Sequence, residues 1–202
     1  MIFWSRVRML PAVYGTLAAV MALGALARSA AVPVPLVQGA VFPVPVALLL
    51  PVVPVCLLLH GQARGDAEAE RVAVRPVRVW DAWAMAGLVP LAGAAGAVTA
   101  WAGHPVGVPI ARNLAGYLGL ALLARWVAGP GAANVVVALF PFACASFGVR
   151  PTGRPEPWAW PFHAPGSVPA LVLAVALLAA GLVVARRDPL AVRREGTAAD
   201  GG

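Results

Sequence analysis

The chain has 202 residues, of which 61% are apolar and only 11% are charged, with a formal net charge of +7. A soluble domain carries about 25% charged residues, and a small soluble domain has too little interior to bury so much apolar surface. All fifteen basic residues are arginine, which excludes a G-x-x-x-x-G-K phosphate loop and a Schiff-base lysine. The composition therefore predicts an integral membrane protein.

The positive charge does not indicate nucleic-acid binding. The arginines stand at the ends of apolar runs and form no continuous basic patch, whereas nucleic-acid-binding proteins gather such residues on one face. Cys56 and Cys144 lie inside apolar segments, where cysteine is usually a small packing residue. Neither redox chemistry nor a metal site is predicted from them.

Six apolar runs approach the length of about 20 residues that a transmembrane helix needs. They cover residues 9–27, 41–59, 82–101, 108–128, 131–147 and 166–185. The second run contains four prolines, so we expect it to be kinked or partly unwound, with its freed carbonyl groups satisfied by neighbouring helices. The fifth is short and is interrupted by Pro141.

The arginines orient this predicted bundle. With six spans, eleven arginines fall on one side of the membrane and four (Arg28, Arg112, Arg150, Arg154) on the other. The arginine-rich side is cytoplasmic by the positive-inside rule, and omitting the fifth span would place the basic tail, 186–202, outside. Five tryptophans fall at span ends, where the indole ring suits the headgroup region: Trp4, Trp80, Trp83, Trp101 and Trp126.

The sequence thus predicts a single all-α membrane domain, a bundle of six transmembrane helices in the plasma membrane with both termini in the cytoplasm. The first run also resembles a cleavable signal, because Arg6 and Arg8 precede it and small residues follow near position 30. Its apolar stretch is longer than a usual signal core. We expect it to be retained as a span.

The cytoplasmic loop at 60–81 contains a predicted short helix at 65–74. Asp66 is a suitable N-cap, acidic residues follow in the first turn, and Pro76 ends the helix. One interpretation is a solvated linker whose acids balance its arginines. The other is a helix that docks in a groove on a partner, with Asp66, Glu68, Glu70 and Arg71 as the docking residues.

The outer loop at 148–165 is rich in proline and aromatic residues. We expect it to fold back on the membrane surface with its aromatic rings at the interface. A ligand-binding role for this loop remains open.

Arg112, with Asn113 beside it, is the only ionisable residue at appreciable depth in a predicted span. Only twelve residues separate Arg112 from Arg125, which is about 18 Å of helix. Arg112 must therefore extend outward to the headgroups or face a polar cavity. The first is the simpler expectation; in the second, Arg112 and Asn113 would line a translocation pathway or attract an anionic group.

No catalytic, cofactor-binding or metal-binding residue is predicted. No acid lies inside a predicted span, and proton- or sodium-coupled carriers generally need one. His60 is on the opposite side of the membrane from His104 and His163, so the three cannot share a metal. Ser146 lacks the glycine-rich surroundings of an intramembrane serine protease.

This layout resembles the permease subunit of an ABC-2 type transporter. That family has six spans, cytoplasmic termini, a coupling helix between spans two and three, and an enlarged outer loop before span six. Residues 65–74, the loop at 148–165 and the basic tail correspond to these features. The very short 1–8 segment departs from the family's long N-terminal interface helix, which puts the N-terminal contact with the ATPase in doubt.

The resemblance implies export of an amphipathic molecule along a path formed with a second permease subunit, in a homodimer or heterodimer. A separate ATP-binding cassette ATPase would bind ATP and Mg and dock on 65–74, while this chain holds no cofactor and contacts membrane lipid but no nucleic acid. The main alternative is a non-transporting accessory or assembly membrane protein. A small enzyme acting on lipid is disfavoured because no catalytic constellation is present.

Overall fold

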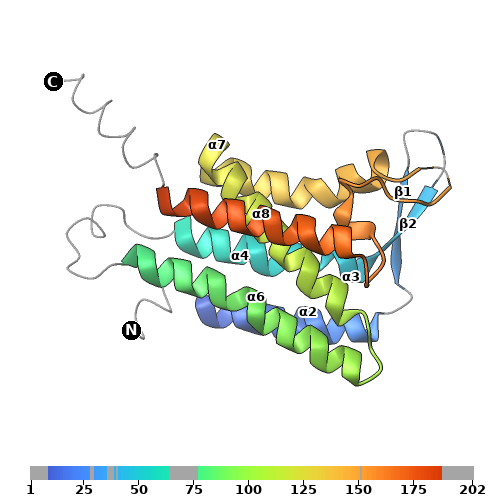
Figure 1. Ribbon diagram of the computed structural model, residues 1–202, viewed down its shortest axis with the longest axis horizontal. Helices are drawn as coiled ribbons and strands as arrows, with labels where there is room; N and C mark the ends of the chain where they lie inside the picture. Colours follow the sequence, from blue (N-terminus) through green and yellow to red (C-terminus); the bar gives the residue numbers. More distant parts are fainter. Residues whose placement is uncertain are drawn as a thin grey trace.

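The computed structural model describes residues 9–27, 30–35, 39, 41–63, 77–150 and 152–187. These residues form an elongated helical assembly whose longer helices run roughly along its long axis, with a small sheet at one end (Figure 1). The elements in chain order are α2 (Leu10–Leu26), β1 (Ala31–Pro35), β2 (Val41–Pro45), α3 (Val46–Leu49), α4 (Val52–Ala63), α6 (Val77–Trp101), α7 (Gly107–Phe147), η1 (Trp160–Phe162) and α8 (Val168–Arg187).

Helix α7 is bent sharply at Gly129. This residue has φ 88° and ψ 174°, a combination that is accessible essentially to glycine alone. Pro130 follows, and its fixed φ suits the start of a new helical segment. Residues 107–128 and 130–147 therefore form two arms, called here the first and second arms of α7, which run back along one another in Figure 1.

The prediction of a six-helix transmembrane bundle is wrong. Within the described residues only α7 and α8 are long and apolar enough to cross a membrane. The run predicted at 9–27 forms α2, which has only 17 residues. The runs predicted at 108–128 and 131–147 belong to a single bent helix, α7.

The other predicted spans also differ from the structure. The run at 41–59 is divided among β2, α3 and α4. The run at 82–101 lies within α6, where the apolar stretch among the described side chains is Gly87–Trp101. The run at 166–185 corresponds to α8, whose apolar window is Val168–Ala185. Counting apolar runs failed because hydrophobicity alone does not separate a span from a shorter buried helix or strand.

Alternating prolines explain why part of the second run is extended. Strands β1 and β2 pair antiparallel with Pro33 opposite Pro43, and a proline has no N–H to give to a ladder. The ladder hydrogen bonds must therefore lie at the intervening pairs, such as Val32 opposite Val44. The backbone nitrogens of the prolines, which carry no hydrogen, then face the two outer edges of the hairpin. Those edges are therefore protected from pairing with other strands.

The first arm of α7 is the central element of the fold. All eight residues from 112 to 119 are buried, so this helix is covered on every side, as expected for the middle of a bundle. Helices α2, α4, α6 and α8 all pack against α7. Leu58, Leu88 and Ile110 are among the largest fully buried side chains of this core.

Two glycines allow α7 and α8 to approach closely. A Cβ atom built on Gly119 would lie 2.3 Å from the backbone carbon of Leu177, and one built on Gly181 would lie 2.7 Å from the Gly119 carbonyl oxygen. The backbones are thus in direct contact. Small residues at helix crossings are typical of membrane proteins, where close packing drives helix association.

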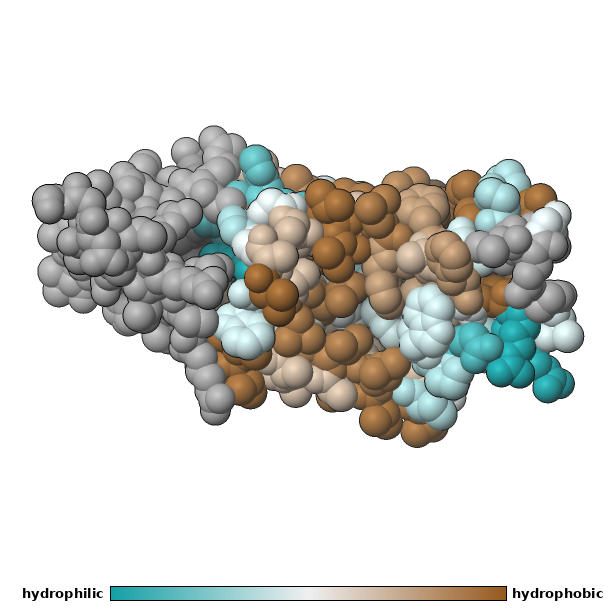
Figure 2. All heavy atoms as spheres, turned by 90° about the horizontal axis from the view of Figure 1, so that it is seen from above, coloured by the Kyte–Doolittle hydropathy of each residue, from teal (hydrophilic) through white to brown (hydrophobic). Residues whose placement is uncertain are grey.

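Helix α8 and the most apolar stretch of α7 expose most of their residues. Only 17% of the residues in the apolar window of α8, and 22% of those in the apolar window of α7, are buried, unlike the core helix of a soluble protein. Leu171, Val172 and Val175 of α8 are each about half exposed or more, and Figure 2 shows hydrophobic side chains covering the middle of one face. Apolar surface of this extent is compatible with lipid rather than water, so the protein is membrane-associated.

Candidate functional site

Arg112 and Asn113 lie near the start of the first arm of α7, and both are buried, with Arg112 only 4% exposed and Asn113 0%. The Arg112 guanidinium donates to the carbonyl oxygens of Ala164 (2.9 Å), His163 (3.0 Å) and Pro161 (3.3 Å). Its Nε donates to Asn113 Oδ1 at 3.3 Å. The side chain therefore neither reaches solvent nor faces an open polar cavity, because residues 161–164 cover it.

Asn113 completes this arrangement from the same helix. Its amide nitrogen donates to the Pro161 carbonyl oxygen at 3.2 Å, so Pro161 accepts from both side chains. The carbonyl groups of Pro161 and His163 belong to or directly follow η1, and carbonyls at the end of a helix attract cations. The Ala164 carbonyl also accepts from the Ser167 N–H at 3.0 Å. Arg112 and Asn113 thus fasten residues 161–164 to α7.

Trp160 inserts from the same loop into the helical core and is only 1% exposed. Its ring lies against Gly116, where any Cβ would come within 2.4 Å of it. The ring centroid is 5.1 Å from that of Tyr117 on the first arm and 5.8 Å from that of Phe140 on the second arm. Arg112 and Gly116 are four residues apart, so they share one face of the helix.

Tyr117 links this cluster to the proline-rich segment. Its hydroxyl donates to the Leu48 carbonyl oxygen at 3.2 Å, next to the break between α3 and α4. The break was expected from the prolines, and a neighbouring helix does supply a hydrogen-bond donor there, because an unpaired carbonyl in an apolar environment is costly.

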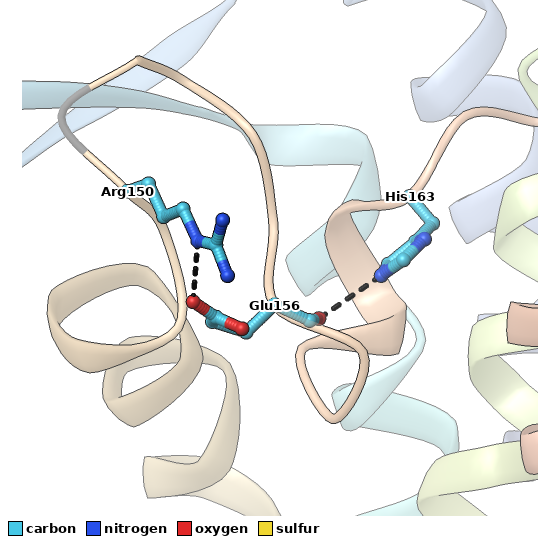
Figure 3. A network of polar contacts seen from close by, with 3 residues as sticks. All are labelled: Arg150, Glu156 and His163. Atoms are coloured by element: carbon cyan, nitrogen blue, oxygen red, sulfur yellow. Dashed lines mark hydrogen bonds and ion pairs between the residues drawn. The ribbon is translucent and has the colours of Figure 1, made fainter.

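A second polar network organises the exposed part of the loop (Figure 3). Arg150 Nε donates to Glu156 Oε1 at 2.6 Å, and the His163 ring contacts the Glu156 carbonyl oxygen through Nε2 at 3.0 Å. Because a carbonyl only accepts, Nε2 carries the proton. Ser167, just before α8, contacts the other ring nitrogen at 3.4 Å.

The ion pair shifts the pKa of both partners. The hydrogen bond and the charge of Glu156 raise the pKa of Arg150, and the hydrogen bond from Arg150 lowers the pKa of Glu156 below its ordinary value of 4.5. Arg150 is exposed and Glu156 is partly exposed, so this pair contributes little to overall stability. It joins the two ends of the turn at 150–156.

The candidate docking residues Asp66, Glu68, Glu70 and Arg71 lie outside the described residues. The described chain before them ends at Ala63 in α4. There Arg125 Nη1 donates to Gln62 Oε1 at 2.9 Å.

No group of three or more His, Cys, Asp or Glu side chains able to hold a metal ion occurs within the described ranges. Cys56 and Cys144 are free thiols, and Cys144 is buried.

The sequence located Arg112 and Asn113 but gave no role to Gly116 and Tyr117. The expectation that the aromatic rings of the loop lie at the membrane interface is wrong for Trp160, which is buried in the core. The available signal was a spacing of four residues. It places Gly116 on the same helix face as Arg112, and Tyr117 on the same face as Asn113. Nothing in the sequence pairs that face with a loop some fifty residues later.

Comparisons of the chain with protein-family models, with curated proteins and with solved structures find no match.

Proposed function

We propose that this chain is a membrane-embedded permease subunit of an ABC-type exporter, driven by a separate ATPase subunit. The observation that carries the proposal is the outer loop, which is inserted between the arms of α7 and held by a buried arginine. A loop held by hydrogen bonds at the outer end of a membrane domain can close a path and, on release, open it.

Three further features support this function. The exposed apolar faces of α7 and α8 suit lipid. Arg112 is a buried charged group, the kind of residue that marks a substrate path in membrane proteins. The acidic segment at 65–74 remains the proposed docking site for the ATPase.

We further propose a multi-pass placement in the plasma membrane with both termini in the cytoplasm. The arginine-rich segments of the sequence favour this orientation. Trp101, the last residue of α6, is 91% exposed. Trp126, near the C-terminal end of the first arm of α7, is partly exposed, and exposed tryptophans suit the headgroup region. From Gly107 to Trp126 the helix rises about 28 Å, close to the thickness of the hydrocarbon core.

The decisive experiment is purification of the full chain in mild detergent, with mass spectrometry of the proteins bound to it. Recovery of an ATP-binding cassette ATPase is expected. Replacing Glu68 and Glu70 together by lysine should weaken that association, whereas Glu195→Lys in the C-terminal tail should leave it intact. Unchanged co-purification of the double variant would exclude docking through 65–74.

A non-transporting accessory protein is the second candidate. It is favoured by the observation that four of the five N–H donors of Arg112 bond to the protein itself, as in a purely structural clamp. Failure to recover any ATPase under conditions that preserve the folded chain would favour this candidate over the exporter.

A further inference from the structure

Trp160 and the carbonyl groups of residues 161–164 contact α7 in the way that a small-molecule ligand with a ring and a polar group would. The Trp160 ring is held between Tyr117 and Phe140, over a floor formed by Gly116. The carbonyl groups that follow the ring bond to Arg112. The Trp160 ring and the carbonyl acceptors thus bind to positions of α7, Gly116 and Arg112, that are separated by about 6 Å along the helix axis.

The acceptors that the Arg112 guanidinium contacts carry no negative charge. Within the described part of the chain, the hydrogen bonds of Arg112 go to neutral carbonyl and amide oxygens. Arginine binds a carboxylate or phosphate more strongly than a neutral acceptor, because both partners are charged and two parallel bonds can form. An anion that displaced the loop would therefore gain a stronger contact than the one it replaced.

We infer that residues 160–164 are a built-in occupant of a substrate site, whose external ligand is an amphiphile with a flat apolar ring and an anionic group. The ring takes the place of Trp160 against Gly116, and the anion takes the place of the loop carbonyls on Arg112. Calling the ligand a substrate rests on the proposed exporter function. The binding site itself rests only on these contacts.

The test uses two probes, indole and indole-3-acetate, with the full-length Trp160→Ala variant in detergent. Removing the ring weakens the loop's hold and leaves room for an aromatic group, as large-to-small changes in apolar cores do. Indole-3-acetate is expected to bind this variant about tenfold more tightly than indole, since a charged hydrogen bond adds roughly one such factor. Calorimetric titration measures both affinities.

Two matched variants make the result specific. Adding Arg112→Gln to Trp160→Ala should abolish the advantage of the acid over indole. Trp158→Ala removes the same side chain from a partly exposed neighbouring position and should bind neither probe above the detergent background. Equal affinities of the two probes for the Trp160→Ala variant, or equal binding by the Trp158→Ala control, would overturn the inference.

A second measurement keeps Trp160 in place and does not depend on the folding of its variant. Ala159 is fully buried, so Ala159→Cys, with Cys56 and Cys144 replaced by alanine, reports displacement of the loop. Millimolar indole-3-acetate should accelerate its reaction with a membrane-impermeant maleimide several-fold, and indole should do so less. A labelling rate that the acid leaves unchanged would contradict the proposed site.

Both measurements use the isolated chain. Absence of an ATPase partner would overturn the exporter function and leave the site standing, whereas equal binding of the probes would overturn the site and leave the ATPase association standing.

Discussion

At Arg112 a buried positive charge is compensated by backbone carbonyl groups and an asparagine. The helix supplies the cation, and residues 161–164 supply carbonyl acceptors, of which Ala164 also accepts from the Ser167 N–H. The contact stabilises the buried guanidinium, which would otherwise be an unpaired charged group in an apolar environment.

Arg112→Gln is expected to lower the free energy of unfolding by about 2–4 kcal/mol, since it removes the charged hydrogen bonds to the carbonyl groups of Pro161, His163 and Ala164. Arg112→Lys should recover part of the loss, because an ammonium keeps the charge but lacks the planar fork of donors. Reversible denaturation in mixed micelles measures both. Equal stability of all three proteins would mean that the clamp is not structural.

The Arg150–Glu156 pair predicts a pH dependence confined to the outer loop. The folded-state pKa of Glu156 is lowered, so its contribution is present above its unfolded pKa and is lost as the pH falls through the folded value. Amide exchange across 148–156, corrected for intrinsic pH dependence, should therefore increase below about pH 4.5, the ordinary glutamate value. Glu156→Gln should show the faster exchange at every pH.

At the scale of elements, the fold depends on where α7 turns. Gly129 joins the two arms in a backbone conformation that other residues rarely adopt, and its position places Phe140 of the second arm beside Trp160. The α7–α8 contact also depends on glycines, but for another reason: Gly119 and Gly181 have no Cβ, so the two backbones can touch.

Gly129→Ala should destabilise the protein by about 1–3 kcal/mol, because alanine at this φ and ψ is strained. Gly131→Ala, two residues away and equally free of steric contact, should be neutral or slightly stabilising, since Gly131 lies in the helix. Thermal unfolding of the two variants in the same detergent makes the comparison. Similar melting temperatures would show that the bend is not required.

Gly119→Ala should separate α7 from α8, because its Cβ would overlap the backbone of Leu177. A loss of about 1–3 kcal/mol is expected, as for other overpacked sites. Gly93→Ala on α6 is the matched control, since a Cβ there has no neighbour within 4 Å. Denaturation of both variants separates overlap from the general effect of replacing glycine.

At the scale of the whole molecule, the apolar band and the placement of polar groups at the ends define how the protein meets its surroundings (Figure 2). The exposed valines and leucines of α7 and α8 would be a liability in water. In lipid they are the ordinary surface of a membrane protein.

The proposed orientation predicts sided labelling in intact cells. With Cys56 and Cys144 replaced by alanine, Gly153→Cys in the outer loop should react with an impermeant maleimide added outside. Gly131→Cys, next to the bend of α7, should react only after the cells are opened. Both positions are exposed, so the reverse pattern would invert the orientation, and outside labelling of both would contradict the spanning placement of the first arm.

Local properties were readable from the sequence alone. Composition determined that lipid is the suitable solvent, because no small soluble core could hide so many apolar side chains. The turn after Ala128, the break near Pro51 and the unusual position of Arg112 also follow from local chemistry. The number of spans did not, because prolines at alternate positions turned 41–45 into a strand, and apolar run length could not distinguish it from a helix.

Only the tertiary structure decided what Arg112 contacts. Its acceptors lie 49 to 52 residues later in the chain, and Trp160 reaches Gly116 across a similar separation. Such contacts depend on how α7 bends and how the loop before α8 returns to it, which no local periodicity encodes. The sequence marked Arg112 as a charge within an apolar run and favoured its extension to the headgroups; in three dimensions it is buried and binds residues 161–164.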